Sequence, residues 1–156
     1  MIFRQAQKND LKSIVDLGYL LAMHEKKADP SLKISSPARK KLKRKYSGQI
    51  GKRDNMFFVA EDNDEIIGFL YGNIEKAPVY LSPHHKKIGN ISSVFVINKY
   101  RKRGIGKGLV SMFLSWTRKR KVRFVQLGVL VKNQSSHNTW KGLGFKDYYV
   151  KMRIIL

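Results

Sequence analysis

The sequence predicts an α/β fold in which helices cover both faces of one mixed β-sheet. The chain has 156 residues, of which 42% are hydrophobic. This length suits one compact domain, because domains cluster around about 100 to 150 residues. Segments with the two-residue period of strands are interleaved with segments of helical period, in the order β-α-α-β-β-β-α-β-α-β, and that order is typical of a mixed sheet. We therefore expect residues 1–156 to form a single domain.

The N-terminal part is predicted as a strand followed by two helices. The strand covers residues 1–6 and the first helix residues 10–24. Ser36 as N-cap and Pro37 at the first helical position predict the second helix, which is rich in lysine and arginine. Because this second helix has few apolar residues, we expect it on the surface.

The middle of the chain is predicted as a hairpin and a loop. Strands at 56–61 and 65–75 flank a short polar turn, and the two prolines of residues 76–90 favour a loop. Gly68 and Gly72 interrupt the second hairpin strand. Glycines in such places mark β-bulges or close approaches of a neighbouring backbone.

The last third of the chain completes the predicted order. A central strand, a long helix, another strand, a short helix ended by Gly144 and a closing strand or hairpin follow one another. Their predicted ranges are 91–97, 104–119, 122–130, 135–143 and 145–156.

Residues 101–109, RKRGIGKGL, place four cations around three glycines where the central strand gives way to a helix. Glycines allow a backbone to approach a phosphate, and the free N–H groups of a helix N-terminus point at it. The cations add attraction. This segment therefore predicts an anion site, the alternative being a strand end surrounded by solvated cations.

Two nucleotide-binding patterns do not match these glycines. A nucleoside-triphosphate loop requires G-x-x-x-x-G-K-[ST] and a carboxylate for magnesium. A dinucleotide fold requires G-x-G-x-x-G, then an acid about 20 residues later. Here the third glycine comes one residue early, and no carboxylate occurs between Glu75 and Asp147.

The pattern R-x-x-G-x-G after a strand, formed by Arg101, Gly104 and Gly106, resembles the pyrophosphate loop of the GNAT superfamily of acetyl-CoA-dependent N-acetyltransferases. Residues 129–145, VLVKNQSSHNTWKGLGF, resemble a later segment of the same superfamily. The matching residues of that later segment are Asn133, Trp140, Gly144 and Phe145. The two blocks occur in the expected order, and the resemblance covers nearly the whole chain.

The resemblance implies a mostly antiparallel sheet with a splayed strand pair at the cofactor site. It also implies transfer of an acetyl group from acetyl-CoA, as co-substrate and without a metal, to a primary amine of a small molecule or protein. The backbone of Phe95 and Val96 is expected to pair with the pantetheine arm. The full set of implied cofactor contacts is Phe95, Val96, Arg101, Lys102, Arg103, Gly104, Ile105, Gly106, Lys107, Asn133 and Trp140.

The general acid and base do not occupy the positions usual in the family. Ser92 and Ser93 stand where many members place acidic residues, and Trp140 stands where many have a tyrosine. An indole donates a hydrogen bond but does not release its proton. Glu75, at the end of strand 65–75, is therefore the predicted base, the alternative being an exposed strand-end charge.

Other residues have weaker predicted roles in the reaction. A cluster in the turn between the first two helices borders the acceptor site in this superfamily, paired histidines in the proline-flanked loop can shuttle protons, and two tyrosines near the C-terminus can act as acids. These residues are His24, Glu25 and Asp29, then His84 and His85, then Tyr148 and Tyr149.

The formal net charge of +21 points to polyanionic partners. Residues 35–46 and 116–124 both have the composition of phosphate-contacting patches with aromatic residues nearby. A basic nucleic-acid- or ribosome-associated binding module is therefore an alternative function. A CoA-binding GNAT fold without catalysis is another, suggested by the missing acid and base.

The composition of the chain also indicates in which cellular compartment the protein is expected. No apolar run approaches the roughly 20 residues that cross a bilayer, and MIFRQAQKNDLKSIV lacks the apolar region of a signal peptide. The chain has no cysteine, so it has no disulfide and no thiolate zinc site. We expect a cytoplasmic protein without a membrane partner. If the protein assembles, the resemblance implies a homodimer, because dimers are common in the superfamily.

Overall fold

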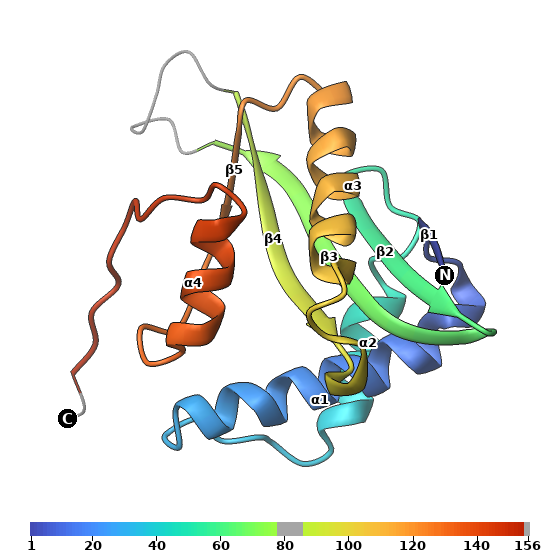
Figure 1. Ribbon diagram of the computed structural model, residues 1–156, viewed down its shortest axis with the longest axis horizontal. Coiled ribbons are helices and arrows are strands. Elements are labelled where there is room, and N and C mark those ends of the chain that lie inside the picture. The colour runs from blue at the N-terminus through green and yellow to red at the C-terminus, as the bar shows by residue number, and fades with distance from the viewer. Residues whose placement is uncertain (78–85, 155–156) are drawn as a thin grey trace.

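Five strands form one sheet in the order β1-β2-β3-β4-β5 in the computed structural model, which describes residues 1–77 and 86–154 (Figure 1). The pairs β1–β2, β2–β3 and β3–β4 are antiparallel, and β5 runs parallel to β4. The predicted mixed, mostly antiparallel sheet is thus confirmed. The strands are β1 (Ile2–Gln5), β2 (Asn55–Asp62), β3 (Glu65–Lys76), β4 (Lys87–Val96) and β5 (Phe124–Leu127).

Helices cover both faces of the sheet, as predicted. Long helix α3 crosses one face, while α1 and α2 pack together on the other and α4 lies next to β5 (Figure 1). Short 3-10 turns precede α1 and α3. The bounds are α1 (Leu11–Ala28), α2 (Ala38–Ser47), α3 (Ile105–Lys119), α4 (Gln134–Gly142), η1 (Lys8–Asp10) and η2 (Asn98–Tyr100).

Two hydrophobic cores arise because successive strand residues point to opposite faces. On β2 and β3 the residues turned toward α1 and α2 are Phe57, Val59, Phe69 and Tyr71. Those turned toward α3 are Met56, Phe58, Ala60 and Leu70. The central strands are therefore buried on both faces, and they form the rigid support on which β4 and its loop are placed.

Gly68 and Gly72 behave as the sequence predicts. Each borders a register shift in the sheet, and a Cβ atom at Gly72 would lie 2.4 Å from a ring carbon of Phe113 and 2.6 Å from the carbonyl oxygen of Asn90. The shift at Gly72 leaves Ser92 as an extra residue in β4. A bulge bends the strand that carries it, and Ser92 with the residues that follow it lines the cavity between β4 and β5.

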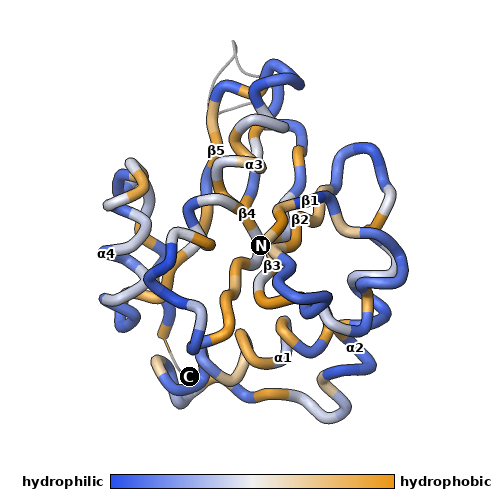
Figure 2. The backbone as a smooth tube through the Cα atoms, turned by 45° about the vertical axis from the view of Figure 1, so that its right-hand side comes forward, coloured by the Kyte–Doolittle hydropathy of each residue, from blue (hydrophilic) through white to orange (hydrophobic). Residues whose placement is uncertain are grey.

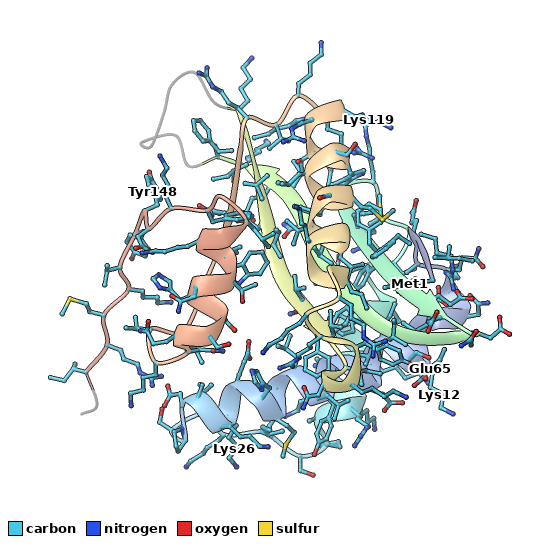
Figure 3. The ribbon with its side chains drawn as sticks, in the orientation of Figure 1. Met1, Lys12, Lys26, Glu65, Lys119 and Tyr148 are labelled. Carbon is cyan, nitrogen blue, oxygen red and sulfur yellow. The ribbon has the colours of Figure 1, made fainter. Side chains whose placement is uncertain are left out.

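The prediction of a closing strand or hairpin over residues 145–156 is wrong for the described part of that segment. Residues 145–154 have no regular secondary structure, and Tyr148 lies on the outer side of α4, away from the sheet (Figure 3). The Arg153 guanidinium instead donates to the Asp29 carboxylate at 2.6 Å, at the end of α1. An ion pair rather than a neighbouring strand thus positions this segment.

Several predicted boundaries also shift. Pro37 is the N-cap of α2, and no side chain within the described residues caps that helix. β4 begins at Lys87, inside the predicted loop, because β3 extends to Lys76 and pairs with it. The remainder of that loop, residues 78–85 with His84 and His85, lies outside the described residues. None of the described helices has the length and apolarity needed to cross a membrane.

Candidate active site

A cavity of about 560 Å³ opens where β4 and β5 part. The two strands are paired from Ile88 and Phe124 to Ile91 and Leu127. Beyond that point the continuing chains, residues 92–96 and 128–130, form two walls of the cavity. The splayed strand pair implied by the family resemblance is present.

The first turn of α3 closes one end of the cavity. Gly104 has φ 78°, a left-handed conformation that favours glycine, and no side chain in the described part of the protein caps this helix. The first N–H groups of α3 therefore lack side-chain partners at the positive end of the helix dipole. A Cβ atom on Gly104 or Gly106 would meet no atom within 4 Å. Open space beside uncapped N–H groups is the arrangement that an anion requires.

Three cations of this segment, Arg101, Lys102 and Lys107, line the cavity. Arg101 donates from Nε to the Val96 carbonyl at 3.0 Å, and its guanidinium lies 5.2 Å from the centre of the Phe95 ring. These contacts hold the charge at a defined position beside the end of β4. These cations therefore attract a polyanion at long range, and the N–H groups of α3 can donate hydrogen bonds to it once it is bound.

Helix α4 forms the opposite wall. Asn133 is its N-cap, and Oδ1 of Asn133 accepts a hydrogen bond from the Ser136 N–H at 3.2 Å. Trp140 packs edge-to-face on Phe145, with ring centres 5.3 Å apart. The cofactor contacts implied by the sequence all line this one cavity, apart from Arg103, whose guanidinium lies 5.6 Å from the centre of the Tyr100 ring.

The C-terminal end of α1 reaches the same cavity through Leu21, His24 and Glu25. Glu25 is the one carboxylate among the described residues that line it. The residue is exposed as a whole, but partial burial of its carboxyl group beside the cavity raises the pKa of Glu25. Burial, followed by the charges of Arg101 and Lys27, lowers the pKa of His24. The neutral form of His24 is therefore favoured, and Glu25 has an increased affinity for protons.

Tyr46 of α2 is buried in the core behind the cavity wall and does not line the cavity, a position that the sequence did not predict. Burial raises the pKa of Tyr46, and the side chain of Ser93, which lines the cavity, partly offsets this shift. Gly18 makes room for the ring, since a Cβ there would lie 3.0 Å from the Tyr46 hydroxyl. The available signal was the spacing of Leu42 and Tyr46, which places both on one face of the otherwise basic helix.

Other predicted residues lie away from the cavity. Glu75 is exposed near the end of β3 and pairs with Ile88, on the part of β4 that precedes the bulge. Asp29 is buried and bonded to Ser31 and Arg153, and the hydrogen bond from Ser31 is the main cause of its lowered pKa. The side chains of Tyr148 and Tyr149 are 78% and 79% exposed and do not line the cavity.

The sequence of residues 20–145 matches the model of the acetyltransferase (GNAT) family. The chain belongs to this family. The GNAT membership accounts for the two sequence blocks and for the splayed strands, which meet at one cavity. It also explains why the loop before α3 differs from both nucleotide-binding patterns.

Two archaeal relatives of this GNAT chain are each 34% identical to it. One, an uncharacterized N-acetyltransferase of Methanocaldococcus jannaschii, aligns over 116 residues, which are 70% of the chain and 47% of the relative. The other, an N-alpha-acetyltransferase of Sulfurisphaera tokodaii, aligns over 97 residues, 60% of the chain and 58% of the relative. The alignments thus span about half the length of these relatives.

A solved structure shows the same fold over nearly the whole chain. It is an aminoglycoside N-acetyltransferase in complex with CoA, with a TM-score of 0.75 and 19% sequence identity. The similarity covers 99% of the present chain and 93% of that chain. At this identity the comparison concerns the fold alone.

Proposed function

We propose that this GNAT chain transfers the acetyl group of acetyl-CoA to a primary amine. The observation that carries the proposal is the uncapped first turn of α3, which opens into a cavity between splayed strands and is flanked by cations. The backbone N–H groups of residues 103–107 would hold the pyrophosphate, with Arg101, Lys102 and Lys107 adding charge. CoA binding by the aminoglycoside enzyme of the same fold supports this assignment.

The transfer needs a proton acceptor at the acceptor end of the cavity. The amine nitrogen attacks the thioester carbonyl, a C–N bond forms, the C–S bond breaks, and the sulfur leaves with a proton. A primary amine is mostly an ammonium ion at neutral pH, so it must first lose a proton. We assign this role to Glu25, because it is the carboxylate that reaches the cavity and because an anionic group also attracts the ammonium.

Replacing Glu25 with glutamine is expected to lower kcat/KM by about a hundredfold, the smaller end of the effect of a lost general base. The ionised form of Glu25 is lost as the pH falls through its raised pKa, so wild-type activity falls in the same direction. In the variant, the fall in activity at low pH that comes from Glu25 should disappear, whereas the fall that comes from protonation of the amine substrate should remain. Steady-state thiol release across pH tests the assignment. If the activity of the variant falls at low pH in the same way as that of the wild type, the assignment of Glu25 is wrong.

Glu75→Gln is the matched comparison, because it removes the same charge from the carboxylate that the sequence alone predicts as base. Glu75 is exposed and does not line the cavity. We therefore expect Glu75→Gln to leave kcat/KM unchanged. If Glu75→Gln reduces activity and Glu25→Gln does not, the role of base belongs to Glu75.

The class of acceptor is best tested with a panel of amines. The N-alpha-acetyltransferase among the relatives favours a protein N-terminus, and the aminoglycoside enzyme of the same fold favours a small molecule. Thiol release with peptides, aminoglycosides and simple amines distinguishes these classes. Binding of CoA without thiol release from any of them would instead support a CoA-binding fold without catalysis.

A further inference from the structure

Helix α2 carries an exposed cationic surface that the acetyl-transfer site does not use. The helix has ten residues and no acidic residue, and its cations are all exposed. Figure 2 shows the hydrophilic colour along α2. We name these residues the α2 basic surface: Arg39, Lys40, Lys41, Lys43, Arg44 and Lys45.

Little in the protein neutralises this surface. Nε of Arg39 lies 2.9 Å from the Asp16 carboxylate, in a pair that is about half exposed on both sides. Within residues 1–77 and 86–154, the other five cations have no carboxylate at ion-pair distance. The chain places most of its other carboxylates in ion pairs, so the α2 basic surface keeps its charge.

The sequence of α2 is unfavourable for an isolated helix. Lys40 and Arg44 form a like-charged pair at i and i+4, and so do Lys41 and Lys45. Cations in the first turn also oppose the helix dipole. Packing of Leu42 and Tyr46 against the core beneath them holds the helix in place. Arg44 and Lys45 in the last turn favour the dipole, but the like-charged pairs repel each other, and an external polyanion would relieve this repulsion.

We propose that the α2 basic surface binds the phosphate backbone of a nucleic-acid duplex. Ten helical residues span about 15 Å, and a duplex carries about one negative charge per 1.7 Å of its axis. The cations along α2 and the phosphates along the duplex are therefore both closely spaced. Lysine-rich contacts of this kind position a protein on the backbone without reading bases.

The aromatic residues near α2 favour a duplex over a single strand. Binding of single strands relies on exposed rings on which bases stack. Tyr46 is only 2% exposed, and the Arg39 guanidinium lies 3.9 Å from the centre of the partly exposed Tyr19 ring, where it occupies one face of the ring. The aromatic residues near residues 35–46 therefore offer little free ring surface for stacked bases.

The same packing disfavours a membrane surface as the partner. An interfacial helix inserts an apolar face among the acyl chains. The apolar residues of α2, Leu42 and Tyr46, are turned into the core instead. The exposed side of α2 is therefore charged rather than apolar, which suits the phosphates of a nucleic acid.

The test uses two variants of the full chain that each lose three positive charges. In the first, Lys40, Lys43 and Arg44 of α2 are replaced with glutamine. In the matched control, Arg118, Lys119 and Arg123 are replaced with glutamine. These three belong to the second basic segment predicted from the sequence, residues 116–124, so the control also compares the two candidate patches. They are exposed near the end of α3, where Lys119 projects from the top of the helix in Figure 3.

Fluorescence anisotropy measures binding to an RNA duplex and a DNA duplex of about 20 base pairs over a series of salt concentrations. The α2 variant is expected to bind at least about tenfold more weakly at moderate salt. The slope of the logarithm of its association constant against the logarithm of salt concentration should be shallower by about 3. The control variant should lose less than about threefold. Circular dichroism melting checks the fold, and acetyl transfer without nucleic acid should be equal in both variants.

Three results would overturn the proposal. Equal weakening by both variants would show a general effect of net charge, and greater weakening by the control would place the contacts at residues 116–124 instead. Tighter binding of wild-type protein to single strands, or to phosphatidylserine vesicles, would show a different partner. A wild-type affinity that does not change with salt would exclude phosphate contacts whatever the variants do. None of these results bears on CoA binding, so this proposal and the acetyl-transfer proposal fail separately.

Discussion

Gly106→Asp is expected to raise the dissociation constant for CoA by at least about a hundredfold, equivalent to about 2.7 kcal/mol. Gly106 lies in the first turn of α3 and lines the cavity, and a Cβ there meets no atom within 4 Å. The fold should therefore tolerate the change, and a carboxylate in the first turn of a helix is favourable. That carboxylate would occupy the positive end of the helix and repel the diphosphate. Isothermal titration calorimetry at fixed ionic strength measures the loss.

Gly142→Asp is the control for this experiment. Gly142 ends α4, and a Cβ there also meets no atom within 4 Å, so the two variants add the same charge at open positions. We expect Gly142→Asp to change the CoA dissociation constant by less than about twofold. If both variants bind CoA as wild-type protein does, the first turn of α3 is not the phosphate site.

Gly72→Ala is expected to destabilise the protein by about 3 kcal/mol, the upper end of the usual cost of overpacking. The added Cβ would lie 2.4 Å from a ring carbon of Phe113 and 2.6 Å from the carbonyl oxygen of Asn90. The ring can shift only into a filled core, and the carbonyl belongs to a paired strand. Urea denaturation followed by circular dichroism gives the free energy of unfolding.

Gly142→Ala is the comparison for stability. It lies in a helix with open space around it, so alanine should leave the free energy of unfolding unchanged or raise it by up to about 1 kcal/mol. Wild-type stability of Gly72→Ala would mean that β3 and β4 do not approach as closely as described. The bulge at Ser92 would then need another explanation.

The phosphate loop was predictable because its chemistry is local. Arg101, Gly104 and Gly106 lie within six consecutive residues, and the strand before them and the helix after them follow from short-range periodicity. Gly68 and Gly72 were predictable for a similar reason, since glycine inside a strand indicates a close neighbour or a bulge.

Features that depend on distant parts of the chain were harder to predict. Residues 145–154 have the alternation of a strand, but a strand also needs a free neighbouring edge, and α4 and the Arg153 ion pair hold this segment elsewhere. Glu25 was placed in a turn because the helical pattern weakens after residue 24. Helix α1 instead continues to Ala28 and presents Glu25 to the cavity.

The most direct test of the acetyl-transfer proposal is a crystal structure of the protein with acetyl-CoA, following a titration that should give a dissociation constant in the micromolar range common for enzyme substrates. The diphosphate should accept hydrogen bonds from the backbone N–H groups of residues 103–107, and the thioester should lie between β4 and β5. A diphosphate bound anywhere else, or a first turn of α3 capped by its own side chains in the complex, would contradict the proposal.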